Sequence, residues 1–138
     1  MVVEEFKLHP QATFGLPLHK LASVAGGHSP ETNAGILERL LKGSIPQQGD
    51  ADETAILDFV IANTAALCVV AGVVPSAAEK GSRWVDEEEL DEQGYAVGKK
   101  WREGVEMVRR GVESGRAWEA WEAFVEVSRK VEGVVGKD

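Results

Sequence analysis

The first part of the chain combines a short alternating pattern with a run of prolines and glycines. Apolar and polar residues alternate loosely across Val2–Leu8, and His9-Pro10 closes this run, which is typical of a short strand. The prolines and glycines up to Gly27 exclude a long helix in the sequence that follows. We expect an irregular connector there, with room for a turn or two of helix over Leu18–Val24.

The next segment carries the start and stop signals of a helix. Ser29 is a favourable N-cap, and Pro30 fits the first helical turn because the N–H that it lacks would have no partner there. At the other end, Lys42-Gly43 supplies a cation near the last carbonyls and a residue that tolerates a left-handed cap. These signals predict a helix from Ser29 to about Gly43.

A second helix is predicted after the loop Gly43–Gly49, with Asp50, Asp52 and Glu53 at its start, and it runs to about Gly72. Acidic residues at its start suit the positive end of the helix dipole. Its apolar side chains occupy nearly all faces, a pattern that indicates a buried helix surrounded by other elements. We expect Leu57 and Leu67 to be core residues, and truncation of either to Ala to lower the stability by about 2 to 5 kcal/mol.

The C-terminal half is also predicted to be helical. Ser76–Glu79 has capping-box spacing, but Gly81 follows closely, so a helix there must be short. Apolar residues then repeat at helical spacing from Trp101 to Val112, and Ser114-Gly115 separates that helix from a last one. The whole pattern predicts a mainly α fold with a short N-terminal strand and about four helices.

Composition and charge narrow the class of protein. The 138 residues suit a single domain, and the formal net charge of -8 repels nucleic-acid phosphates and anionic lipid. The N-terminus lacks the pattern of a secretory signal, and the longest apolar stretch, Ala65–Pro75, is about half of a membrane span. Cys68 is the one cysteine, so neither a disulfide framework nor a cysteine-based zinc site can form. We expect a cytoplasmic protein with no nucleic-acid and no membrane partner.

More than half of the net charge lies in one segment. Glu79–Gly94 carries seven acidic and two basic residues, a balance of -5. Asp86–Glu89 lacks the glycine and the alternating ligand positions of a calcium loop. We therefore interpret residues of about 79–98 as a solvated acidic insert, and expect deletion of Asp86–Asp91 to change the stability little.

The histidines and the Gly-Gly pair do not have the spacing of a known site. His9, His19 and His28 are ten and nine residues apart, which suits no zinc motif on a single helix, so surface or capping roles are expected. Gly26-Gly27 before the helix cap could direct N–H groups at a phosphate. An ordinary cap is favoured, because the sequence has neither a P-loop lysine nor a dinucleotide fingerprint.

Polar residues inside the apolar helix need partners. Asp58 and Asn63 would each destabilise the fold by about 1 to 3 kcal/mol if buried without a hydrogen bond. Bonds to neighbouring backbone are favoured, with a ligand contact as the alternative. Cys68 is interpreted as a small buried hydrophobe. The tryptophans are interpreted as packing residues, namely Trp84, Trp101, Trp118 and Trp121. We assign no catalytic, cofactor-binding or metal-binding residue.

Five segments follow one another in a recognisable order. They are Thr13–Pro17, Gly26–Leu37, Leu40–Gly43, Ala62–Leu67 and Gly104–Ala117. In order and spacing they resemble the C-terminal third of anthranilate phosphoribosyltransferase. That family has Phe-Gly-Leu, Gly-Gly with a later Asn-Ala, a Leu-x-Gly helix end, an Asn-Ala-Ala helix and a Gly-Val to Ser-Gly-x-Ala helix pair. Two departures are Thr64, where the family usually has Ala, and a longer, more acidic connection over residues 72–99.

The resemblance implies an enzyme of tryptophan biosynthesis that joins anthranilate to phosphoribosyl pyrophosphate with magnesium. The family's Gly-Thr-Gly-Gly-Asp loop, its Lys-His-Gly-Asn segment and its Asp-Glu magnesium pair lie upstream of the matching region, so no catalytic residue is carried over. Residues 1–138 then correspond to an incomplete C-terminal part of the family's α/β domain, made of a terminal strand and closing helices. We expect this segment to bind no cofactor and to be inactive alone.

Two functions remain open at this point. The chain is either a structural segment that works with the upstream portion of the same enzyme, or a freestanding helical interaction module derived from that scaffold. An incomplete domain exposes an apolar face, so we expect self-association or binding to the upstream portion. The expected contacts are Val2, Phe6 and Leu8 on the strand and the uncovered sides of the helix Ala55–Ala71.

Overall fold

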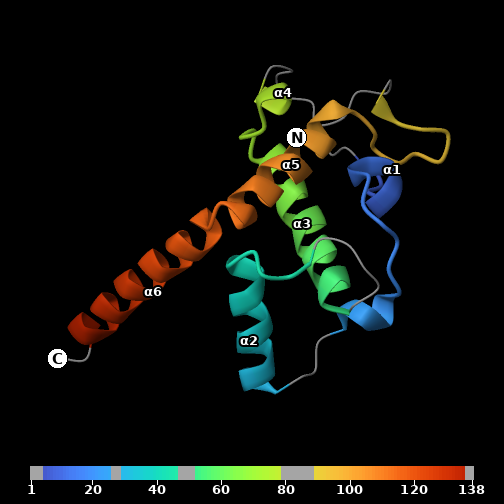
Figure 1. The fold of residues 1–138 in the computed structure, drawn as a ribbon. Coiled ribbons are helices and arrows are strands. Elements are labelled where there is room, and N and C mark those ends of the chain that lie inside the picture. The colour runs from blue at the N-terminus through green and yellow to red at the C-terminus, as the bar shows by residue number, and fades with distance from the viewer. Residues whose placement is uncertain (1–4, 26–28, 47–51, 79–88, 136–138) are drawn as a thin grey trace.

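A computed structural model describes residues 5–25, 29–46, 52–78 and 89–135 of the chain (Figure 1). This part of the protein is mainly helical, as the sequence predicts. In chain order the elements are α1 (Pro10–Phe14), the 3₁₀ helix η1 (Leu21–Val24), α2 (Pro30–Leu41), α3 (Asp52–Val70), α4 (Pro75–Ala78), α5 (Lys99–Glu113) and α6 (Arg116–Val135).

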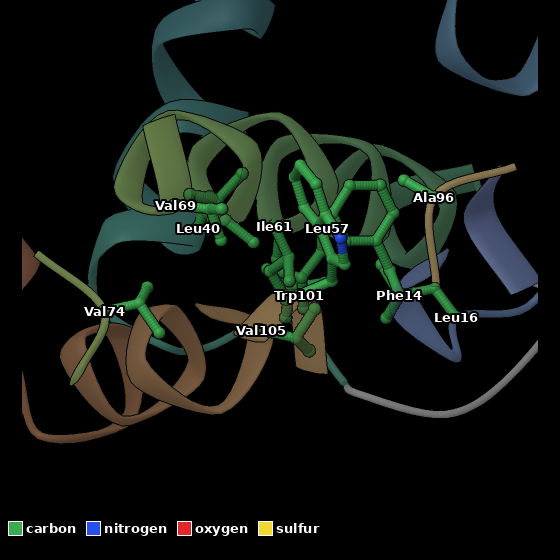
Figure 2. Close-up of a cluster of buried hydrophobic side chains, with 12 residues drawn as sticks. Phe14, Leu16, Leu40, Leu57, Ile61, Val69, Val74, Ala96, Trp101 and Val105 are labelled. Atoms are coloured by element: carbon green, nitrogen blue, oxygen red, sulfur yellow. The ribbon is translucent and has the colours of Figure 1, made fainter. Parts of the chain in front are cut away.

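Helices α3 and α5 pack against each other at the centre of the fold. At their crossing, a Cβ added to Gly104 would lie only 3.1 Å from the carbonyl oxygen of Ala65, so the backbones approach closely. The fully buried Trp101 packs edge-on against Phe14 of α1, with 5.9 Å between ring centroids. Figure 2 shows the cluster of buried side chains to which this ring belongs. Its other labelled members are Phe14, Leu16, Leu40, Leu57, Ile61, Val69, Val74, Ala96 and Val105.

Helix α2 begins and ends where the sequence predicts. The Ser29 hydroxyl accepts a hydrogen bond from the N–H of Thr32, and Pro30 occupies the first turn. Gly43 follows the helix with a φ of 66°, in the left-handed region that its lack of a side chain permits. The capping interpretation is confirmed at both ends.

The predicted N-terminal strand over Val2–Leu8 is not seen in the described residues. Only Lys7 pairs with another segment, through a single parallel bridge to Tyr95, and residues 1–4 lie outside the described part of the chain. The pairing stops there because His9 already caps α1 and because the partner segment turns back on itself. Phe6 nevertheless packs against Trp101, with 5.9 Å between ring centroids.

Helix α3 is covered on one side rather than all round. It packs against α5 and η1, which bury Leu57 to 2% exposure. Leu67 is 68% exposed, so its assignment to the core was wrong. When apolar residues occupy all sides of a helix, its sequence does not indicate which side is buried. The elements that pack against the helix determine that side. In length and composition α3 could also span a membrane, a test that core helices of soluble proteins pass as well.

The acidic segment is anchored at its C-terminal end. Residues 79–88, which include Trp84 and most of the acidic run, lie outside the described part of the chain. Glu89 is not a free surface residue, because its carboxylate lies 2.6 Å from the buried Nζ of Lys100. Ala96 is fully buried and Leu90 packs against the core. The interpretation as a solvated insert is therefore wrong for Glu89, Leu90 and Ala96, whereas Glu92 and Gln93 are exposed as it predicts.

Helix α6 projects away from the rest of the molecule (Figure 1). Near its start it touches α5 and α2, and the ammonium of Lys42 lies 4.4 Å from the ring centroid of Trp118. Further along, Phe124 is 62% exposed and Val127 is similarly exposed. The prediction that the tryptophans pack is confirmed for Trp101, whereas Trp121 is 38% exposed and contacts Phe124.

Candidate functional site

A cavity of about 240 Å³ lies between the connector after α1 and the surface of α3. Most of the residues around it are apolar, and the two polar ones are His19 and Asp58. The apolar lining consists of Pro10, Leu16, Pro17, Leu21, Val24, Ala55, Phe59 and Ala62. A concave, mostly apolar surface with a few polar groups is the usual form of a small-molecule site.

The connector is folded over α3 by a helix end and a buried anchor. His9 caps α1 by accepting a hydrogen bond from the N–H of Ala12 at 3.1 Å. Gly15 ends α1 with a φ of 70° and turns the chain, so that Leu16 is buried directly after it. The 3₁₀ turn η1 then packs on α3 and closes the cavity from the connector side.

Asp58 is the buried polar group at the base of this cavity. It is 3% exposed, and its Oδ2 lies 2.8 Å from Nε2 of His19. Its Oδ1 lies 3.6 Å from a guanidinium nitrogen of Arg109 on α5. A buried carboxylate is tolerated only when charged or polar partners compensate its lost hydration. The cluster therefore ties the connector, α3 and α5 together at one point.

His19 is the second polar residue of the lining. Nε2 faces the carboxylate of Asp58, which can only accept, so Nε2 carries a proton. Within the described residues, Nδ1 has no hydrogen-bond partner. None of the described residues that line the cavity is Ser, Thr, Cys, Lys or Tyr. The arrangement can bind and orient a molecule, and its two polar side chains, His19 and Asp58, are paired with each other.

The structure corrects the predicted partners of the polar residues in α3. Asp58 was expected to bond to nearby backbone, yet it pairs with two side chains, His19 and Arg109. Asn63 does bond to backbone, since its amide donates to the carbonyl of Phe59 at 2.8 Å, but it is exposed rather than buried. In the sequence, this cluster was indicated only by the carboxylate at position 58, which lies in the middle of an apolar helix and needs a partner.

The remaining candidates do not converge on this cavity. His9 caps α1 as expected, and Cys68 is a half-buried free thiol packed against the core. His28 and the Gly26-Gly27 pair lie outside the described part of the chain. Across the described ranges, no three His, Cys, Asp or Glu side chains come together in a way that could hold a metal ion.

The described residues define a mainly helical protein with a largely apolar cavity beside α3. No protein-family model matches the chain, and no solved structure matches it. Among curated proteins, it is similar to an anthranilate phosphoribosyltransferase of Schizosaccharomyces pombe, with 30% identity over 124 residues. The match covers 90% of this chain and 27% of that protein, so the chain spans little more than a quarter of its relative's length.

Proposed function

We propose that the chain is a C-terminal, non-catalytic segment of an anthranilate phosphoribosyltransferase. In tryptophan biosynthesis this enzyme transfers phosphoribosyl from phosphoribosyl pyrophosphate to anthranilate. The observation that carries the proposal is the 30% identity over 124 residues. In this role the chain works with an upstream portion that holds the phosphate loop, the magnesium-binding pair and both substrates. The segment itself supplies helices that close the domain.

Exposed apolar side chains on two helices support this function. Leu67, Val70 and Val73 are exposed in and after α3, and Phe124 and Val127 are exposed on α6. Large apolar patches on a soluble protein mark surfaces that another chain or domain covers. An upstream portion that packed along these helices would bury them.

A reconstitution experiment tests the proposal. The purified chain is assayed with phosphoribosyl pyrophosphate, anthranilate and Mg²⁺, alone and after mixing with an upstream portion carrying the Gly-Thr-Gly-Gly-Asp and Lys-His-Gly-Asn segments. We expect no turnover from the chain alone, because the groups that position and stabilise the transferring phosphoribosyl are missing. Mixing should restore turnover, and a Phe124→Glu variant should restore less of it than the wild type.

Two results would contradict the proposal. Magnesium-dependent turnover by the chain alone would show that it is itself a catalyst. A compact monomer that neither binds nor activates the upstream portion would instead favour the freestanding helical interaction module. In that case the exposed face of α6, where Trp121 and Phe124 lie side by side with 5.8 Å between ring centroids, is the surface to test for a partner.

A further inference from the structure

We infer that the cavity between η1 and α3 binds a small uncharged molecule made of one apolar ring and a hydroxyl group. The described residues that line the cavity all lie between Pro10 and Ala62. The inference depends on the size of the cavity, on the chemistry of its lining and on the state of His19.

The volume sets the size of the ligand. An apolar cavity of about 150 Å³ is large enough to take up benzene. The cavity beside α3 measures about 240 Å³, which leaves space for one ring and one or two substituents. It lies below the range of about 300 to 1,000 Å³ that is usual for drug-sized ligands, so it cannot enclose a nucleotide.

The lining requires a ligand that is mainly apolar. Eight of the ten residues around the cavity have apolar side chains or are proline. Two of them, Leu21 and Phe59, are 81% and 52% exposed, so the cavity opens to solvent between η1 and α3. An apolar ring bound there would cover apolar surface of η1 and of α3. Each Å² of apolar surface removed from water contributes about 25 cal/mol to binding.

The polar group of the ligand is determined by His19. Because Nε2 donates to Asp58, Nδ1 is an acceptor in the neutral imidazole and a donor in the charged form. A hydroxyl satisfies either state, since it can both donate and accept. A carboxylate ligand would add a second negative charge beside Asp58. An ammonium ligand would find both oxygens of Asp58 already engaged, by His19 and Arg109.

The test compares three probes of nearly equal shape. The whole chain is titrated with p-cresol, with toluene and with p-toluate, and backbone amide NMR shifts are followed. We expect saturable shifts for p-cresol at residues of η1 and α3 and about three- to tenfold weaker binding of toluene, the range that one hydrogen bond contributes. We expect p-toluate to bind weakest.

Two variants and a matched control locate the site. Ala62→Leu should abolish the p-cresol shifts by filling the cavity, whereas Ala123→Leu on the exposed side of α6 should leave them unchanged. His19→Phe keeps a ring at this position and should remove the preference of p-cresol over toluene. The inference is overturned if p-cresol gives no saturable shifts, if Ala62→Leu binds it as well as the wild type, or if toluene binds equally well.

Discussion

Helices α3 and α6 have nearly the same length, 19 and 20 residues, but opposite surroundings. Helix α3 lies under η1 and α5, whereas α6 extends away from the body of the protein (Figure 1). The sequence of α6 is the more amphipathic of the two, which usually indicates packing on a core. The comparison shows that an apolar stripe on a helix identifies a face that can be buried. Whether this face is buried depends on the other elements that pack against it.

A matched pair of leucines within α3 should show the largest difference. Leu57→Ala removes a side chain that is 2% exposed and should lower the free energy of unfolding by about 2 to 5 kcal/mol. Leu67→Ala, at a position 68% exposed, should change it by no more than about 0.5 kcal/mol. Urea denaturation of both variants measures the effect. Equal losses would mean that α3 is covered on both sides in solution.

Replacing each of two glycines of α5 by alanine should change the stability in opposite directions. Gly104→Ala places a methyl 3.1 to 3.4 Å from Ala65 and should destabilise the α3–α5 crossing by about 1 to 3 kcal/mol. Gly111→Ala meets no atom within 4 Å and should stabilise by up to about 1 kcal/mol, because alanine favours the helix. Thermal denaturation of the two proteins gives the answer. Stabilisation by Gly104→Ala would contradict the close crossing.

The projecting part of α6 is tested by Phe124→Ala. Because Phe124 is 62% exposed, its loss should change the free energy of unfolding by no more than about 0.5 kcal/mol, far less than that of Leu57. If the exposed face mediates association, the same variant should lower the average mass in sedimentation at micromolar concentration. A loss above about 2 kcal/mol would place Phe124 in a core contact.

The smallest effect is expected at the contact between α4 and α5. Hydrogen bonds from Lys99 and Ser76 hold the pKa of Glu103 below its ordinary value of 4.5. A carboxyl whose pKa is lowered by folding stabilises the fold above its unfolded pKa and loses that contribution as the pH falls. Glu103→Gln should therefore flatten the loss of stability below about pH 4.5. Glu122→Gln on α6 is the control and should follow the wild-type curve.

The candidate site was only partly visible in the sequence. Asp58 could be picked out because a carboxylate in an apolar helix needs a partner. Its partners could not, since His19 lies 39 positions away and Arg109 comes from another helix. No local periodicity encodes a contact of that separation. Leu67 was misplaced for a related reason, because a helix that is apolar all round does not indicate which side is covered.

By itself, the sequence determined the mainly helical class, the caps of α2 and the break between α5 and α6. These features depend on groups within a few residues of one another, such as Ser29 with the N–H of Thr32. Only the tertiary structure decided which side of α3 is buried, that Lys7 forms a single bridge instead of a strand, and that Glu89 pairs with a buried Lys100. The reason is physical, because burial and ion pairing are set by chain segments that meet in space after long separations in sequence.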